Sequence, residues 1–121
     1  ALTIGETASG RKARVLHTFF EMADGACLAF FEEPDAPFDF KEQRDFDLHI
    51  ALEVSHETLL SMFEKGKAAG IETRGISDHG FIDSIYFRDP NGYVIELTAV
   101  KDTDAPRPDA HRILADWQAG K

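Results

Sequence analysis

The sequence has few cysteines, few basic side chains and no long apolar run, and each shortage excludes a class of protein. Cys27 is the only cysteine among 121 residues, so no disulfide forms within the chain. The 13 lysine and arginine residues are outnumbered by 22 aspartate and glutamate residues. The net charge of −9 argues against nucleic acid and anionic membranes as partners. No segment is typical of a transmembrane helix or a signal peptide. We therefore expect a cytoplasmic protein that binds neither nucleic acid nor membrane.

The composition is that of a folded domain. Hydrophobic residues make up 43% of the chain and charged residues 29%. Ten residues are phenylalanine, which predicts a core or pocket with much flat apolar surface. Cys27 lies in an apolar strand pattern, and we expect it to be a small buried side chain rather than a nucleophile.

The most informative stretch is Ser84–Leu97, which is typical of two strands joined by a tight turn. The turn sequence is Asp-Pro-Asn-Gly at 89–92, in which proline presets φ and glycine adopts positive φ. Glu96 lies inside the otherwise apolar second strand. A charge in that position is costly to bury unless something pairs with it, and a metal ion is one candidate partner.

The remaining pattern predicts an α+β fold. We expect strands over 1–5, 14–22, 27–32, 47–54, 71–77, 82–88 and 93–100. Ser55 is typical of a helix N-cap and Gly70 of a helix end, with an apolar stripe of Leu59, Leu60 and Phe63 between them. A second helix after Pro108 carries Ile113, Leu114 and Trp117, which we expect to dock on the body. The order from 47 to 100 is therefore β-α-β-β-β.

A weak internal repeat relates 24–30 to 91–97, in turn placement and in alternation. Glu96 then corresponds to Ala29. The first half of the chain is interpreted as the end of a second β-α-β-β-β unit whose opening strand and helix are missing.

Strand alternation puts His49, Tyr86 and Glu96 on the face that the helix does not cover. An imidazole and a carboxylate from different strands suit one divalent metal: Fe(II), Mn, Ni or Zn. In the alternative, His49 is an ordinary strand histidine and Glu96 is part of a salt bridge.

Three further side chains are candidates for chemistry. His17 is a candidate proton carrier or a structural histidine. His79, in Ser77-Asp78-His79-Gly80, either binds a ligand or is an exposed loop histidine. Tyr86 either donates a hydrogen bond to a substrate oxygen or packs. The charge-rich segment 35–47 is interpreted as a solvated connector.

His49 opening a strand, followed by a helix and then by Tyr86–Leu97 with its Asp-Pro-Asn-Gly turn and Glu96, resembles the second module of the vicinal oxygen chelate superfamily. This superfamily includes glyoxalase I, fosfomycin- and bleomycin-resistance proteins, and extradiol dioxygenases. The resemblance implies paired βαβββ modules that form a cupped mixed sheet around a metal. Residues 1–33 would end an N-terminally incomplete first module, 34–46 connect, 47–100 form the second module, and 101–121 form a tail and helix of the same single domain.

The resemblance also implies roles. His49 and Glu96 would be metal ligands. Ala29 occupies the first module's carboxylate position and cannot bind metal, and that module's opening histidine would lie before Ala1. A ligand set of two histidines and one glutamate is most similar to the extradiol branch. In that branch His17 would be the acid–base group, while Tyr86 and His79 would orient the substrate.

The predicted function is therefore a metal-dependent oxygenase that resembles extradiol ring-cleavage dioxygenases, uses Fe(II) and acts on a small aromatic vicinal diol. One alternative is a glyoxalase-like lyase or isomerase with a dicarbonyl substrate. The other is a metal-free drug-binding protein of the bleomycin-resistance type. We expect a homodimer, in which module exchange is one way to complete the metal site.

Overall fold

The computed structural model describes residues 1–36, 39, 44–101 and 109–121. The chain forms two compact units, residues 1–39 and 40–121, and each is described by itself. The α+β class predicted from the sequence is confirmed. The cup that two such modules would enclose stays a prediction.

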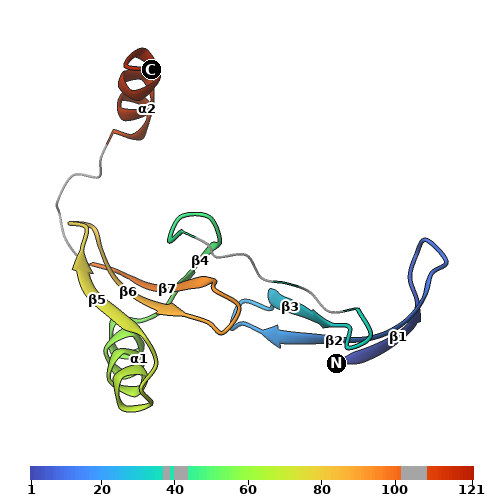
Figure 1. Ribbon diagram of the computed structural model, residues 1–121. Coiled ribbons are helices and arrows are strands. Elements are labelled where there is room, and N and C mark those ends of the chain that lie inside the picture. Colours follow the sequence, from blue (N-terminus) through green and yellow to red (C-terminus); the bar gives the residue numbers. More distant parts are fainter. Residues whose placement is uncertain (37–38, 40–43, 102–108) are drawn as a thin grey trace. The chain divides into compact units, whose positions relative to one another are not determined.

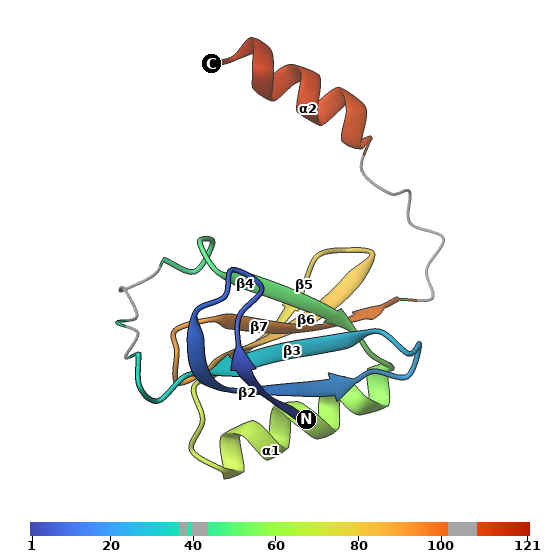
Figure 2. The same cartoon turned by 90° about the vertical axis from the view of Figure 1, so that its right-hand side faces the viewer.

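The first unit is a three-stranded antiparallel sheet of order β1-β2-β3. Its strands are β1 (Leu2–Glu6), β2 (Lys12–Glu21) and β3 (Cys27–Glu32) (Figure 2). Cys27, at the start of β3, is exposed, so the prediction that it is buried is wrong. It pairs with Glu21 at the turn end of the hairpin, where the sheet packs little around it.

The second unit contains the complete βαβββ order (Figure 1). Its elements are β4 (His49–Glu53), α1 (His56–Ala68), β5 (Thr73–Asp78), β6 (Ile82–Arg88) and β7 (Val94–Val100). The sheet order is β4-β7-β6-β5, in which β4 runs parallel to β7 and the other neighbours are antiparallel. The parallel pair forms because α1 carries the chain back across the sheet between the first strand and the last three.

Helix α1 begins where the sequence predicts and covers one face of this sheet. The Ser55 hydroxyl accepts the backbone N–H of Thr58 at 3.1 Å, which caps the helix. The core beneath it contains the buried side chains of Leu59, Ile85 and Leu97. Met62 and Phe63 pack against this core, together with Leu52, Val54 and Phe87. Leu60, which the sequence places in the apolar stripe, is instead 42% exposed, because it lies beside the stripe rather than on it.

Gly66 has a packing role that helix propensity alone does not indicate. It is buried, and a Cβ added there would lie 2.5 Å from both Phe87 Cε1 and Thr73 Oγ1. Glycine in a helix interior costs about 1 kcal/mol relative to alanine. Here that cost is offset because glycine lets the last turns of α1 approach β5 and β6.

The internal repeat is visible in two matching turns, one in each unit. In the first, the Met22 backbone N–H donates to the Ala26 carbonyl at 2.8 Å, and the Gly25 backbone N–H donates to the Met22 carbonyl at 3.0 Å. In the second, the Asp89 backbone N–H donates to the Tyr93 carbonyl at 2.9 Å, and the Gly92 backbone N–H donates to the Asp89 carbonyl at 3.0 Å. Both glycines have positive φ, 84° and 89°. The same hydrogen-bond pattern therefore places Ala29 in β3 and Glu96 in β7 at corresponding positions.

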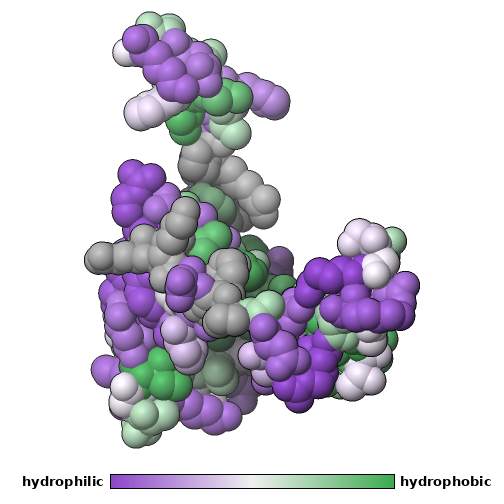
Figure 3. Space-filling model, turned by 45° about the vertical axis from the view of Figure 1, so that its right-hand side comes forward, coloured by the Kyte–Doolittle hydropathy of each residue, from purple (hydrophilic) through white to green (hydrophobic). Residues whose placement is uncertain are grey.

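The predicted C-terminal helix is present as α2 (Ala110–Ala119), capped by Asp109. Its apolar side chains Ile113, Leu114 and Trp117 are exposed, and Figure 3 shows hydrophobic atoms beside hydrophilic ones on this helix. Its docking on the body stays a prediction. Within the part of the chain that the structure describes, no helix is long and apolar enough to cross a membrane.

We expect Gly66→Ala to destabilise the second unit by about 1–2 kcal/mol. Contacts as short as 2.5 Å put the overpacking cost at about 2–3 kcal/mol, the upper part of its usual range, and the improved helix propensity offsets about 1 kcal/mol of it. The measurement is urea unfolding followed by circular dichroism at 222 nm. Gly5→Ala is the control, because an added Cβ there meets nothing within 4 Å. A Gly66→Ala protein as stable as the wild type would contradict this account of the packing.

Candidate functional site

The predicted pair of His49 and Glu96 comes together across β4 and β7. The parallel register places Ala51 opposite Glu96, so His49 lies one pleat along the same face. His49 Nε2 is 2.8 Å from Glu96 Oε2. The His49 side chain is 28% exposed and that of Glu96 14%, so the pair is open to solvent on the histidine side.

The hydrogen bonds of His49 constrain what lies between it and Glu96. His49 Nδ1 is 3.1 Å from the Asp45 backbone oxygen. A carbonyl only accepts, so Nδ1 carries a proton and Nε2 of a neutral imidazole is then an acceptor. An ionised Glu96 is an acceptor as well. Two acceptors 2.8 Å apart repel unless a proton or a metal ion is shared between them, and a shared proton makes the contact an ordinary hydrogen bond.

Tyr86 lies beside this pair, directly opposite Glu96 in the register of β6 and β7. Its ring meets the His49 ring edge-on, with centroids 6.1 Å apart. Its hydroxyl is 2.9 Å from His79 Nε2. His79 is thus exposed in the loop between β5 and β6, as one of the two alternatives expected, and its ring also contacts Tyr86. The structure brings four of the five predicted site residues onto one face of the four-stranded sheet.

The loop that carries His79 is anchored by charge. Asp78 Oδ2 lies 2.8 Å from Lys101 Nζ, and Asp78 Oδ1 accepts the Gly80 backbone N–H at 2.7 Å. The Lys101 ammonium, followed by the Gly80 hydrogen bond, holds the pKa of the Asp78 carboxyl below its ordinary value. The ion pair joins the end of β5 to the end of β7, and so restrains the turn that holds His79.

Two buried hydroxyls on the same face were not singled out by the sequence. Ser84 and Thr98 are directly opposite each other, two residues along from Tyr86 and Glu96. Ser84 is fully buried. Neither Ser84 Oγ nor Thr98 Oγ1 has a hydrogen-bond partner among the described residues. Small hydroxyl side chains in a strand carry no distinguishing sequence signal, which is why the pattern did not find them.

His17, the fifth predicted site residue, lies in β2 of the first unit. Its ring stacks on Phe31 with centroids 3.9 Å apart, and is tilted against Phe19 at 4.1 Å. Its Nε2 is buried and has no partner within the described ranges. Packing between two aromatic rings supports a structural part for His17, while the unused nitrogen leaves the proton-transfer prediction open.

Asp45 was missed because it lies in the segment interpreted as a solvated connector. Its carboxylate contacts Arg74 Nη1 at 2.7 Å and also contacts Arg88 Nη2. Arg74, followed by Arg88, holds the pKa of Asp45 below its ordinary value. Charge patterning along the chain does not reveal such contacts, because the partners are 29 and 43 residues away.

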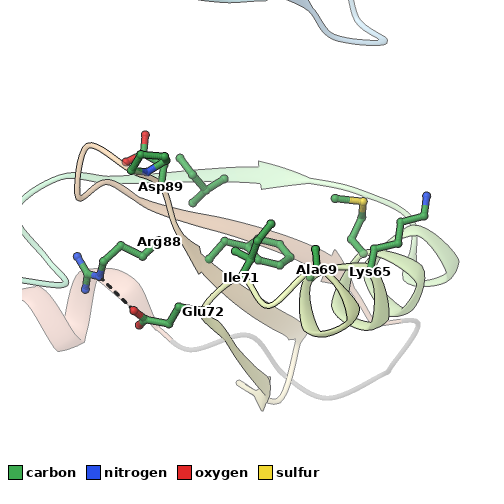
Figure 4. A pocket seen from close by; sticks show the side chains of 11 residues that line it. Lys65, Ala69, Ile71, Glu72, Arg88 and Asp89 are labelled. Atoms are coloured by element: carbon green, nitrogen blue, oxygen red, sulfur yellow. Dashed lines mark ion pairs between the residues drawn. The ribbon is translucent and has the colours of Figure 1, made fainter.

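A groove of about 720 Å³ lies on the other face of this sheet, against the end of α1. Figure 4 shows Ala69 and Ile71 beside it, with the ion pair of Arg88 and Glu72 at one end. Phe87 and Ile95 also line it, and they point away from Tyr86 and Glu96 because side chains alternate along a strand. The groove is therefore separate from the His49–Glu96 pair.

No family model and no curated protein matches the chain, but solved structures do. The genomically encoded fosfomycin resistance protein FosX from Listeria monocytogenes is 26% identical, with a TM-score of 0.54 over 74% of this chain and 69% of that one. A glutamate-to-glutamine mutant of FosX, complexed with Mn(II) and 1S,2S-dihydroxypropylphosphonic acid, is 24% identical, with a TM-score of 0.55 over 84% and 71%.

An integron cassette protein from the mobile metagenome of the Halifax Harbour sewage outfall is 21% identical, with a TM-score of 0.52 over 76% and 72% of the two chains. The chain thus shares the fold of these proteins. Fosfomycin-resistance proteins are among the members of the superfamily that the sequence resembles. The structures do not single out the extradiol branch.

We expect the carboxyl of Asp78 to titrate below its ordinary pKa of about 3.9. Because folding lowers this pKa, the contribution of Asp78 to stability is present above the unfolded-state value and is lost as the pH falls through the folded-state value. Carboxyl ¹³C NMR titration measures it. Lys101→Gln should raise the pKa, and Lys65→Gln, which removes the same charge from α1, should leave it unchanged. An unchanged pKa in Lys101→Gln would refute the assignment.

Proposed function

We propose that this chain is a metal-dependent enzyme of the vicinal oxygen chelate superfamily, in which His49 and Glu96 bind one divalent cation. The observation that carries the proposal is the 2.8 Å approach of His49 Nε2 and Glu96 Oε2, while Nδ1 is committed to the Asp45 carbonyl. This separation of the two acceptor atoms supports the proposal, because one cation can be shared by both.

The donor set fits such a cation. Two ligand atoms at about 2.1 Å in adjacent positions of an octahedral site are about 3.0 Å apart, close to the observed separation. In the described ranges no cluster of three or more histidine, cysteine, aspartate or glutamate side chains forms around the pair. The remaining positions are thus left for a ligand from elsewhere, such as the second histidine that the resemblance implies, and for substrate. The Mn(II) in FosX structures supports a divalent metal on this fold.

When bound, the metal supplies Lewis acidity, and redox chemistry if it is Fe(II). The residues of this chain supply orientation. His79 holds the Tyr86 hydroxyl, and if His79 Nε2 donates to the phenol oxygen, the phenol proton is free to bind a substrate oxygen. The edge-on contact of the two rings supports a position for Tyr86 beside His49, the proposed metal ligand. His17 remains the proposed acid–base group.

The substrate class we propose is a small molecule with two adjacent oxygen atoms. The sequence resemblance favours an aromatic vicinal diol, with ring cleavage by an extradiol-type oxygenase that uses Fe(II). A second candidate follows from FosX, whose mutant structure holds Mn(II) and a vicinal dihydroxy phosphonate. In that case the reaction is not an oxidation. A glyoxalase-like reaction and metal-free drug binding remain alternatives, and the homodimer and the cytoplasmic location remain predictions.

The metal ligands are tested by Mn(II) titration calorimetry. We expect His49→Ala and Glu96→Gln each to weaken binding by about 100-fold or more, because loss of a ligand costs at least as much as loss of an outer partner. His111→Ala, on α2, is the matched control and should bind like the wild type. Retention of the metal by the His49→Ala protein would show that the ligand assignment is wrong.

The substrate class is tested by competition between catechol and phenol for the Mn(II)-loaded protein. Catechol offers two adjacent oxygens and phenol one, so we expect catechol to bind about tenfold or more tightly, and only when metal is present. Equal affinities would overturn the class. The oxygenase is tested by anaerobic reconstitution with Fe(II), addition of catechol and then oxygen: uptake supports ring cleavage, and its absence with bound catechol favours the non-oxidative candidate.

A further inference from the structure

Asp45 connects the segment before β4 to β5 and β6, the two strands farthest from β4 in the sheet order. Its carboxylate binds Arg74 of β5, with 2.7 Å between Oδ2 and Nη1, and Arg88 of β6 through its other oxygen. Arg88 Nη1 also donates to the Gly92 carbonyl at 2.9 Å, in the turn between β6 and β7. We call Asp45, Arg74 and Arg88 the Asp45 clasp.

Glu72 adds a second carboxylate beside the two arginines of the clasp, so that the positive and negative charges are equal in number. Glu72 lies 3.5 Å from Arg74 Nε and 3.8 Å from Arg88 Nε, and Figure 4 shows the second of these ion pairs. Two carboxylates thus neutralise two guanidinium groups. Each carboxylate oxygen of Asp45 is contacted by a different guanidinium group, one from β5 and one from β6, so the direction of the carboxylate is set as well as its distance. The Asp45 backbone is therefore held from β5 and β6, across β7.

The backbone of Asp45 is also what holds His49. Its carbonyl accepts the His49 Nδ1 proton at 3.1 Å, and this one contact sets the tautomer of the ring and its rotation about Cβ. The opposite nitrogen then points to Glu96. Arg74 also contacts Tyr86, the hydrogen-bond partner of His79, because the Arg74 guanidinium lies over the Tyr86 ring, 6.0 Å from its centroid.

We propose that the Asp45 clasp is a positioning device for His49: it fixes the carbonyl that receives the Nδ1 proton, and so aims Nε2 at the metal. The inference rests on the proposed function, since it concerns the role of His49 as a ligand. Asp45 is a positioning residue and touches neither metal nor substrate. Outer partners of metal-bound histidines are commonly worth about 10- to 100-fold in metal affinity.

The first experiment measures Mn(II) affinity by calorimetry in the full chain. Asp45→Asn keeps the size of the side chain and its backbone carbonyl but removes both ion pairs, and we expect it to weaken binding by about tenfold. The control is Asp47→Asn, which removes a charge from the same segment, where Asp47 pairs with Arg44 at 2.8 Å instead of with β5 and β6. It should stay within about twofold of the wild type. Equal losses of Mn(II) affinity in the Asp45→Asn and Asp47→Asn proteins would overturn the proposal that the clasp positions His49.

A second measurement needs no metal. In histidine labelled with ¹⁵N, the wild-type Nδ1 proton of His49 should be visible and slow to exchange, and in Asp45→Asn it should exchange about tenfold faster. Arg74→Lys, which keeps the charge but replaces the planar guanidinium by an ammonium on a shorter side chain, should give a smaller change in the same direction. It replaces Asp45→Asn if that variant does not fold. An Nδ1 proton that exchanges equally in the wild type and the variants would refute the proposal.

These measurements separate the two proposals. If His49→Ala retains Mn(II), the proposed metal site is wrong, and the exchange of the Nδ1 proton still decides whether the clasp orients the ring. If His49→Ala loses the metal while Asp45→Asn binds it like the wild type, the metal site stands and the clasp is overturned.

Discussion

The two-residue alternation of β6 and β7 is the constraint on which the rest of the second unit depends. Ile85 and Leu97 point to α1 and form the core, and Tyr86 and Glu96 point to the opposite face. The alternation therefore puts these apolar core side chains on one face of the sheet, and Tyr86 and Glu96 on the other. A shift of one residue in register would expose the core and bury the carboxylate under the helix, so core packing specifies the site as well as the fold.

The packing of α1 strengthens this constraint. Gly66 lets the helix approach Phe87 and Thr73 more closely than any residue with a Cβ allows. Helix propensity alone makes any glycine in a helix interior a weak point, because propensity describes the isolated helix and not its contact with a sheet. The same limit applies to Leu60. Spacing assigned it to the apolar stripe, whereas the residues of α1 that meet the core are Leu59, Met62 and Phe63.

The sequence was most informative where chemistry is local. The Asp-Pro-Asn-Gly turn, the Ser55 cap and the alternation of β7 are decided by neighbouring residues, and the βαβββ order and the facing of His49 and Glu96 followed from them. Contacts between distant residues were not predictable in this way. Asp45 contacts Arg74 and Arg88 because folding brings β5 and β6 close to the segment before β4. His79 contacts Tyr86 because the turn between β5 and β6 brings the His79 ring close to the Tyr86 hydroxyl.

The parallel pairing of β4 with β7 has a consequence for dynamics. Among the described strands β4 has a neighbour on one side only, and edge strands of this kind open at lower free energy than central ones. His49 is the first residue of that strand, and Glu96 is in a strand with neighbours on both sides. A cation shared by the two side chains would tie the less stable strand to the more stable one. Binding of the proposed cation and the local opening of this five-residue strand would then be linked, so that a bound cation would suppress the opening of β4.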